Sequence, residues 1–189
     1  MGKKLSMIGL IALAVIALPA CIPTETPAPT ARPAPELLRE RGEYFSAAGE
    51  CAVCHSNLVN ESGEDISMDA GWRGSMMANS GRDPYYLAGV RNEVEAYPEY
   101  QAVIEAKCSL CHYPMAHTTA VREGFETAIL GDGWTNPENT LHNLGMDGVS
   151  CALCHQVRPD GFGQPESFTG HFAIDMETPF GERIVYGPF

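Results

Sequence analysis

The chain begins with a single apolar run that is too short to be a comfortable membrane span. Residues Met7 to Leu18 are almost all hydrophobic, and Lys3 and Lys4 precede them. A short apolar run behind positive charges is typical of an export signal, whereas a bilayer span needs about 20 apolar residues. We therefore predict that residues 1–20 are a signal segment and that the protein is exported.

The later hydrophobic pattern predicts short helices separated by long loops. Asp83 and Pro84 form an N-cap and first-turn pair, which predicts a helix that runs as far as Tyr97. Further helices are expected over residues 36–54, 99–111 and 121–130. The last ten residues read as a short apolar strand. Because Gly, Pro and Asn are frequent between these segments, the predicted fold class is mainly α with long loops.

Composition places the chain in the globular class and makes it acidic. The 189 residues are 44% hydrophobic and 19% charged, and 12 Lys and Arg face 24 Asp and Glu, for a formal net charge of -12. A field of this sign repels phosphate backbones, so nucleic acid is excluded as a partner.

A proline-rich stretch follows the signal and precedes the predicted domain. Residues 21–35 hold five prolines among Thr and Ala, a composition that favours an extended tether over a packed core. Just before it, Leu18-Pro19-Ala20-Cys21 resembles the lipobox of bacterial lipoproteins. That resemblance implies a lipid on Cys21, although a plain signal peptide with an incidental cysteine is the alternative. The remaining residues, 36–189, form the predicted domain.

Three copies of the pentapeptide C-x-x-C-H carry the candidate chemistry. The copies are Cys51-Ala52-Val53-Cys54-His55, Cys108-Ser109-Leu110-Cys111-His112 and Cys151-Ala152-Leu153-Cys154-His155. This pentapeptide is the attachment signature of c-type haem. Its two thiols add across the two vinyl groups of one porphyrin, and the next residue delivers an imidazole to the iron. The sequence therefore predicts three covalently bound haems c.

Paired cysteines have two other common uses, structural zinc sites and disulfides. Structural zinc needs four ligands per site, and three pairs do not divide into four-cysteine sites. Disulfides suit an exported protein, but neither zinc nor a disulfide requires a His directly after each pair. Six of the seven cysteines are thus assigned to haem, which leaves Cys21 for lipid.

The second axial position of each iron needs a further ligand. Outside the motifs the chain holds three more histidines, His117, His142 and His171, which equals the number of predicted haems. Each is a candidate distal ligand, with an ordinary exposed histidine as the alternative. The five residues from His112 to His117 span at most about 17 Å when extended, so His117 is expected to serve a haem other than the one on its own motif.

These motifs resemble the multihaem cytochromes c that include the cytochrome c-554-like proteins. In that family a W-x-x-S-x-H stretch often supplies a distal His, and the matching stretch here is Trp72-Arg73-Gly74-Ser75-Met76-Met77. Met77 stands where the family has His, so the resemblance implies a possible Met ligand, with core packing as the alternative. A second likeness is the run Gly148 to Gln156 through the third motif. The resemblance implies a small multihaem cytochrome c fold, and since members continue past this length, it favours an N-terminal fragment or a shortened member.

The expected function is electron transfer as a relay between redox protein partners. Haems with both axial positions filled bind substrate poorly, and the spare ligands are enough to close every site. The alternative is a haem oxidoreductase of the multihaem reductase or hydroxylamine-oxidising type, which needs one open-face haem; no C-x-x-C-K variant occurs. A third hypothesis is a haem-based sensor or a subunit of a larger respiratory complex. Other haem subunits or further copies of this chain are candidate partners. The expected location is the periplasmic or outer cell-surface side of a membrane, through the lipid anchor.

Overall fold

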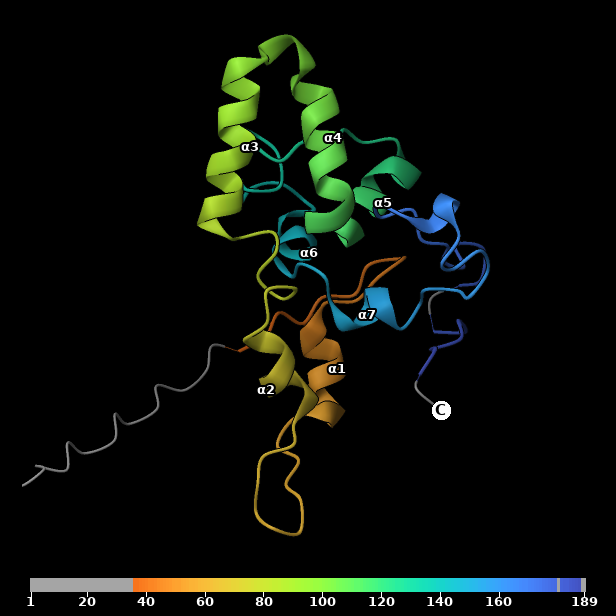
Figure 1. Ribbon diagram of the computed structural model, residues 1–189. Helices are drawn as coiled ribbons and strands as arrows, with labels where there is room; N and C mark the ends of the chain where they lie inside the picture. Colours follow the sequence, from red (N-terminus) through yellow and green to blue (C-terminus); the bar gives the residue numbers. More distant parts are fainter. Residues whose placement is uncertain (1–35, 180, 188–189) are drawn as a thin grey trace, which may run out of the picture. The chain divides into compact units, whose positions relative to one another are not determined.

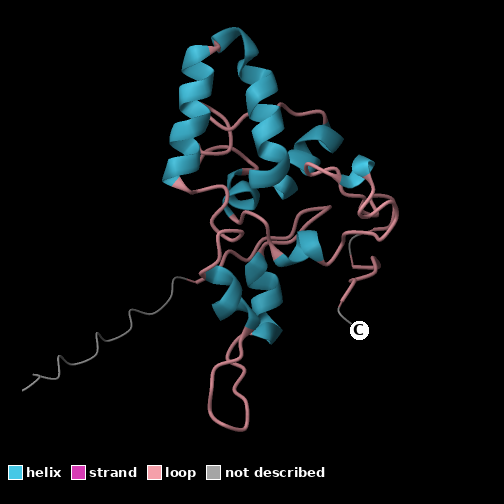
Figure 2. Cartoon of the chain, in the orientation of Figure 1, coloured by secondary structure: helices cyan, strands magenta, loops and turns pink. Residues whose placement is uncertain are grey.

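In the computed structural model, the described residues, 36–179 and 181–187, form helices joined by loops (Figures 1 and 2). Within these ranges extended backbone pairs only as three isolated bridges, so the expected mainly α class is confirmed. None of the helices in these ranges is both long and apolar enough to cross a bilayer. The predicted signal segment 1–20, Cys21 and the tether up to residue 35 lie outside the described residues.

The helices in chain order are α1 (Ala48–His55), α2 (Met68–Arg73), α3 (Pro84–Ala96), α4 (Gln101–His112), α5 (Pro114–Glu123), α6 (His142–Met146) and α7 (Cys151–Cys154), with 3-10 turns η1 (Pro98–Tyr100) and η2 (Pro165–Ser167).

Helices α3 and α4 form an antiparallel hairpin, shown in green in Figure 1. The predicted start is confirmed, because Asp83 Oδ1 accepts a hydrogen bond from Tyr85 N at 2.9 Å and Pro84 is the first helical residue. Pro98 ends the first arm and opens the η1 turn that leads into the second arm. Helix α4 then ends at His112, so it carries the whole second pentapeptide.

The predicted helix over residues 36–54 is wrong for its first half. Only α1, from Ala48 onward, is helical, and residues 36–47 fold back over its start. Gly49 makes this possible: it donates its N–H to Leu38 O at 2.9 Å, and a Cβ at this position would lie 2.2 Å from the same oxygen. The chain therefore gives up helical hydrogen bonds here for a close backbone approach that only glycine allows.

The helix expected over 121–130 begins and ends earlier than predicted. Pro114 opens α5 and Gly124, at φ +77°, closes it in the left-handed conformation that favours glycine at a helix end. The residues after Gly124 are a loop, in which Ile129 N donates to the buried Glu105 carboxylate at 2.6 Å. The strand predicted near the C-terminus is also absent from residues 181–187.

Most of the buried hydrophobic side chains among the described residues form two clusters. One contains Tyr44, Phe45, Met115, Leu144, Ala152 and Leu153. The other contains Val90, Tyr113, Ala116, Ala120, Ile129 and Trp134. Helix α5 contributes to both clusters, since Met115 belongs to the first and Ala116 to the second. Helix α7, with the third pentapeptide, therefore packs on the first cluster, and Cys108 of the second pentapeptide packs against the other.

Candidate functional site

Each cysteine pair lies on a helix, which places its two thiols about one turn apart on one side. The pairs belong to α1, α4 and α7, and in every case the following histidine stands at the C-terminal end of the helix. All six thiols are free, and the second cysteine of each pair is exposed. Two thiols and one imidazole are thus presented together, which is the donor set that a c-type haem uses.

The ring of His112 is held from two sides. Its Nδ1 lies 3.1 Å from the backbone oxygen of Ser80, while the Ser80 hydroxyl donates to His112 O at 2.9 Å. The Tyr86 ring stacks on the imidazole with centroids 3.6 Å apart and planes 2° from parallel. A carbonyl oxygen only accepts, so the proton of the neutral ring is on Nδ1. The Nε2 lone pair is therefore available to a metal, as in metal-bound histidines whose other nitrogen donates to a carbonyl.

Tyr86 also carries a buried polar atom with no partner. Its hydroxyl oxygen is buried and makes no hydrogen bond within the described part of the chain. Burial raises the pKa of Tyr86, and the nearby Cys108 thiol contributes further. Buried tyrosine hydroxyls usually find a partner. The unpaired Tyr86 hydroxyl, beside the second pentapeptide, is consistent with a group that binds there.

His155 of the third pentapeptide is held in the same way by the end of the described chain. Its Nδ1 lies 2.5 Å from the backbone oxygen of Tyr186, and Tyr186 N donates to His155 O at 2.7 Å. The carbonyl again fixes the proton on Nδ1 and leaves Nε2 free. His55 of the first pentapeptide is exposed, and none of the described residues hydrogen-bonds to its ring.

Two of the three other histidines share this presentation. His142 opens α6, and its Nδ1 lies 2.8 Å from the backbone oxygen of the buried Trp134. His117 lies on α5, and its Nδ1 is 2.8 Å from the Ser109 hydroxyl. Burial lowers the pKa of His117, and the charge of neighbouring His171 lowers it further. His142 and His117 are therefore held through Nδ1 like His112 and His155, whereas no described residue hydrogen-bonds to the ring of His171.

Met77 is placed beside the third pentapeptide by backbone contacts. Its carbonyl accepts from Val149 N at 3.0 Å, and the Trp72 indole donates to Val149 O at 2.9 Å. The side chains of Met77 and Met76 are 54% and 84% exposed, so core packing does not account for either methionine in this polypeptide. The Trp72 to Met77 stretch is thus fixed against the residues that lead into Cys151.

The first and third pentapeptides lie side by side. Helices α1 and α7 are in contact, and the interaction of the two thiols lowers the pKa of Cys51 and raises the pKa of Cys151. The buried Asp147 carboxylate joins the two segments, since it accepts from Ala48 N at the start of α1 at 2.8 Å. Burial raises the pKa of Asp147. The first cysteines of these two motifs are therefore neighbours.

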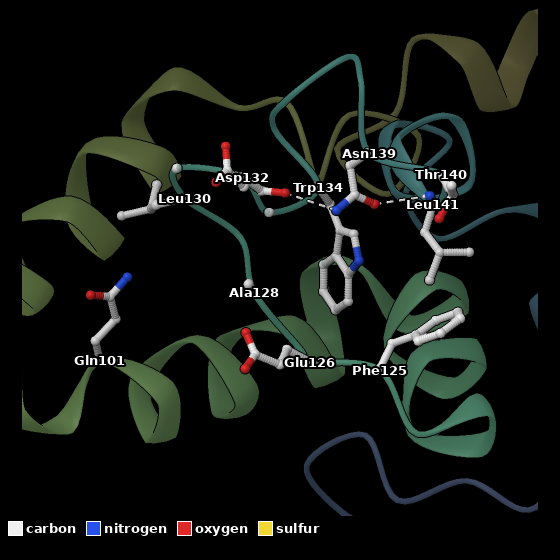
Figure 3. A pocket seen from close by; sticks show the side chains of 12 residues that line it. Gln101, Phe125, Glu126, Ala128, Leu130, Asp132, Trp134, Asn139, Thr140 and Leu141 are labelled. Carbon is white, nitrogen blue, oxygen red and sulfur yellow. Dashed lines mark hydrogen bonds between the residues drawn. The ribbon is translucent and has the colours of Figure 1, made fainter.

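A pocket of about 410 Å³ opens between the start of α4 and the 125–141 segment (Figure 3). The Asn139 side chain links two parts of the pocket wall: it donates a hydrogen bond to Asp132 O and accepts one from Leu141 N, each at 2.9 Å. Trp134 and Leu141 line it, whereas none of the six thiols is among the described lining residues. The pocket therefore lies in the segment that presents His142, and not at a cysteine pair.

No group of three or more His, Cys, Asp or Glu side chains in the described ranges converges as a metal cage. A haem has no need of one, because the porphyrin nitrogens bind the iron and the protein adds only axial side chains. Sequence reasoning missed the partners that orient the rings, namely Ser80, Ser109, Trp134 and Tyr186, and it missed Asp147 and Tyr86. Of these, only Ser109 carried a signal, since it stands inside a pentapeptide.

Comparisons with protein-family models, with curated proteins and with solved structures found no match for this chain.

Proposed function

We propose that this protein is an exported electron carrier that binds three haems c and is tethered to a membrane through a lipid on Cys21. The observation that supports it most is the common presentation of four imidazoles. His112, His155, His117 and His142 all have Nδ1 engaged and Nε2 free. Two of them follow cysteine pairs and two do not, which is the arrangement expected of proximal and distal ligands.

The haem supplies the reversible one-electron change of its iron, and the polypeptide provides the ligands and their orientation. Cys51 with Cys54, Cys108 with Cys111, and Cys151 with Cys154 would hold the porphyrins, and the histidine after each pair would be the proximal ligand. His117, His142 and Met77 would serve as distal ligands, with His171 as the remaining candidate beside His117. Ser80 and Tyr86 fix the His112 ring, so this side chain would hold an iron with little rearrangement.

A relay agrees better than an enzyme with these candidate ligands. An open-face haem needs a vacant axial position and acid-base groups near it. The chain instead offers a distal candidate for each haem, two of them with fixed rings. The proximity of the first and third attachment points favours short distances between two of the haems. The acidic net charge of -12 favours redox partners with a basic docking face.

The decisive experiment counts porphyrins on the full chain. The protein is produced in a host with haem-attachment machinery, purified in detergent, acid-denatured and reduced, and its intact mass is measured. We expect the mass of three haems above the polypeptide, and a lipid at Cys21. The double variant Cys108→Ser with Cys111→Ser should lose one haem and keep two. A colourless chain with the mass of bare amino acids overturns the proposal.

A second measurement separates the carrier from the enzyme. The reduced wild-type protein is exposed to carbon monoxide, which binds ferrous haem only where an axial position is open or easily opened. We expect slow and substoichiometric binding. Rapid binding at one haem per chain would instead favour the oxidoreductase.

A further inference from the structure

The residue between the two cysteines of the second pentapeptide contacts a histidine on the next helix. Ser109 is fully buried on α4, and its hydroxyl lies 2.8 Å from His117 Nδ1 on α5. The same hydroxyl lies 3.0 Å from the backbone oxygen of Ala106. The short span between His112 and His117 points His117 to a haem other than the one on Cys108 and Cys111.

The two contacts of Ser109 define which nitrogen of His117 carries the proton. A hydroxyl has one proton to donate and two lone pairs that accept. Because the Ala106 carbonyl only accepts, the Ser109 proton is directed to it, and the contact with His117 must then be donated by Nδ1–H. The other tautomer would give up one of the two hydrogen bonds. His117 is therefore left with its Nε2 lone pair free, like the rings that face carbonyl oxygens.

We propose that Ser109 is a positioning residue for a distal haem ligand: it orients His117 and holds it in the Nδ1–H tautomer. This inference rests on the proposed function, since it assumes that His117 binds iron. Through Ser109, the spacer of one attachment motif sets the ligand of a neighbouring haem. A donated Nδ1–H bond also raises the basicity of the imidazole, which favours the ferric state.

The contact between Ser109 and His117 can be tested by mutation, because the partner of this ring is a side chain. His112, His142 and His155 are held by backbone carbonyls, which a side-chain substitution does not remove. The Ser109 hydroxyl is removed by Ser109→Ala. Thr118→Val is the matched control, because the Thr118 hydroxyl donates to Pro114 O at 2.7 Å on α5 beside His117 and makes a bond of the same kind.

The experiment is a spectroelectrochemical titration of the full haem-loaded protein, with the haem count checked by mass on the same sample. Loss of an outer partner of a metal ligand typically costs about 10- to 100-fold in metal affinity, and only the part of that loss that falls on the ferric state alone shifts the potential. A tenfold loss of preference for the ferric state raises a one-electron midpoint potential by about 59 mV. We expect Ser109→Ala to raise one of the three potentials by up to about this amount. Ser109→Thr, which keeps a hydroxyl, and Thr118→Val should both leave the three potentials at their wild-type values.

The outcomes separate this inference from the proposed function. Three haems by mass with unchanged potentials in Ser109→Ala would overturn the role of Ser109 alone, as would an equal shift in Thr118→Val. A chain without haem would overturn the proposed function. If Ser109→Ala does not accumulate, the hydrogen bond itself is read in the reduced wild-type protein with ¹⁵N-labelled histidine by NMR, from the rate at which the Nδ1–H proton of His117 exchanges with solvent. Slow exchange of this proton supports the inference, because Ser109 holds it, and exchange as fast as that of an exposed ring overturns it.

Discussion

Gly148 stands where the Trp72 to Met77 stretch meets the segment before the third pentapeptide, and its replacement tests that contact. Gly148 has φ +65°, so an alanine there adopts a left-handed conformation that costs about 1–2 kcal/mol. The new Cβ would also lie 2.6 Å from Met77 O and 2.9 Å from Ser80 Oγ. Met77 O accepts from Val149 N, and weakening that bond adds about 1–3 kcal/mol. We therefore expect Gly148→Ala to destabilise the fold by about 2–5 kcal/mol in total.

Gly163→Ala is the matched control for the backbone strain. Gly163 has φ +81°, and a Cβ there meets no atom within 4 Å. This variant should lose only the left-handed cost of about 1–2 kcal/mol. Urea unfolding followed by far-UV circular dichroism gives the midpoint of each variant at a common slope. Equal midpoints for the two variants, or no loss in Gly148→Ala, would refute the packing described here.

The remaining predictions concern two buried acids and Met77. Asp147→Ala should cost about 1–3 kcal/mol, since it leaves Ala48 N without its partner. Burial raises the pKa of Asp147, so the native state binds more protons than the unfolded state. The free energy of unfolding therefore falls as pH rises from about 4 through the raised pKa. In Asp147→Asn, the urea midpoint should depend less on pH over this range. Glu105→Ala should cost about 1–3 kcal/mol by thermal melting, because Ile129 N is left unpaired, and Glu105→Gln should cost less because it keeps an acceptor. If Met77 binds iron, Met77→His should lower one haem potential in a redox titration, because imidazole replaces a thioether; unchanged potentials would remove Met77 from the ligands.

The helices that could be predicted are those whose ends are marked by local chemistry. Asp83 with Pro84 at one end and Pro98 at the other bracket α3, and each acts through the backbone within one turn. The failures have a different origin. Residues 36–47 leave the helical path because Gly49 accepts a close approach from Leu38, a contact across eleven residues that no local pattern displays.

The cysteine pairs and the histidines that follow them could be read from the sequence, but the atoms that orient these histidines could not. A pentapeptide is contiguous, so the spacing of its two cysteines and its histidine is visible in the sequence itself. The partners of its histidines are backbone oxygens from distant loops: Ser80 lies 32 residues from His112, and Tyr186 lies 31 residues from His155. Since any residue type supplies a carbonyl, such a partner leaves no trace in the amino-acid pattern.

The long loops provide the backbone oxygens that hold the imidazole rings. Most carbonyl groups in a helix accept hydrogen bonds within that helix, so the oxygens that can hold an imidazole come from turns and irregular segments. Ser80, Trp134 and Tyr186 all lie in such segments, outside the helices that carry the rings they hold. Helix α5 joins the two buried clusters and carries His117 between Met115 of one and Ala120 of the other. The short helices thus present thiols and imidazoles, and the loops fix the tautomer of His112, His142 and His155. His117 is held by a hydroxyl instead, and it lies on the helix that both clusters share.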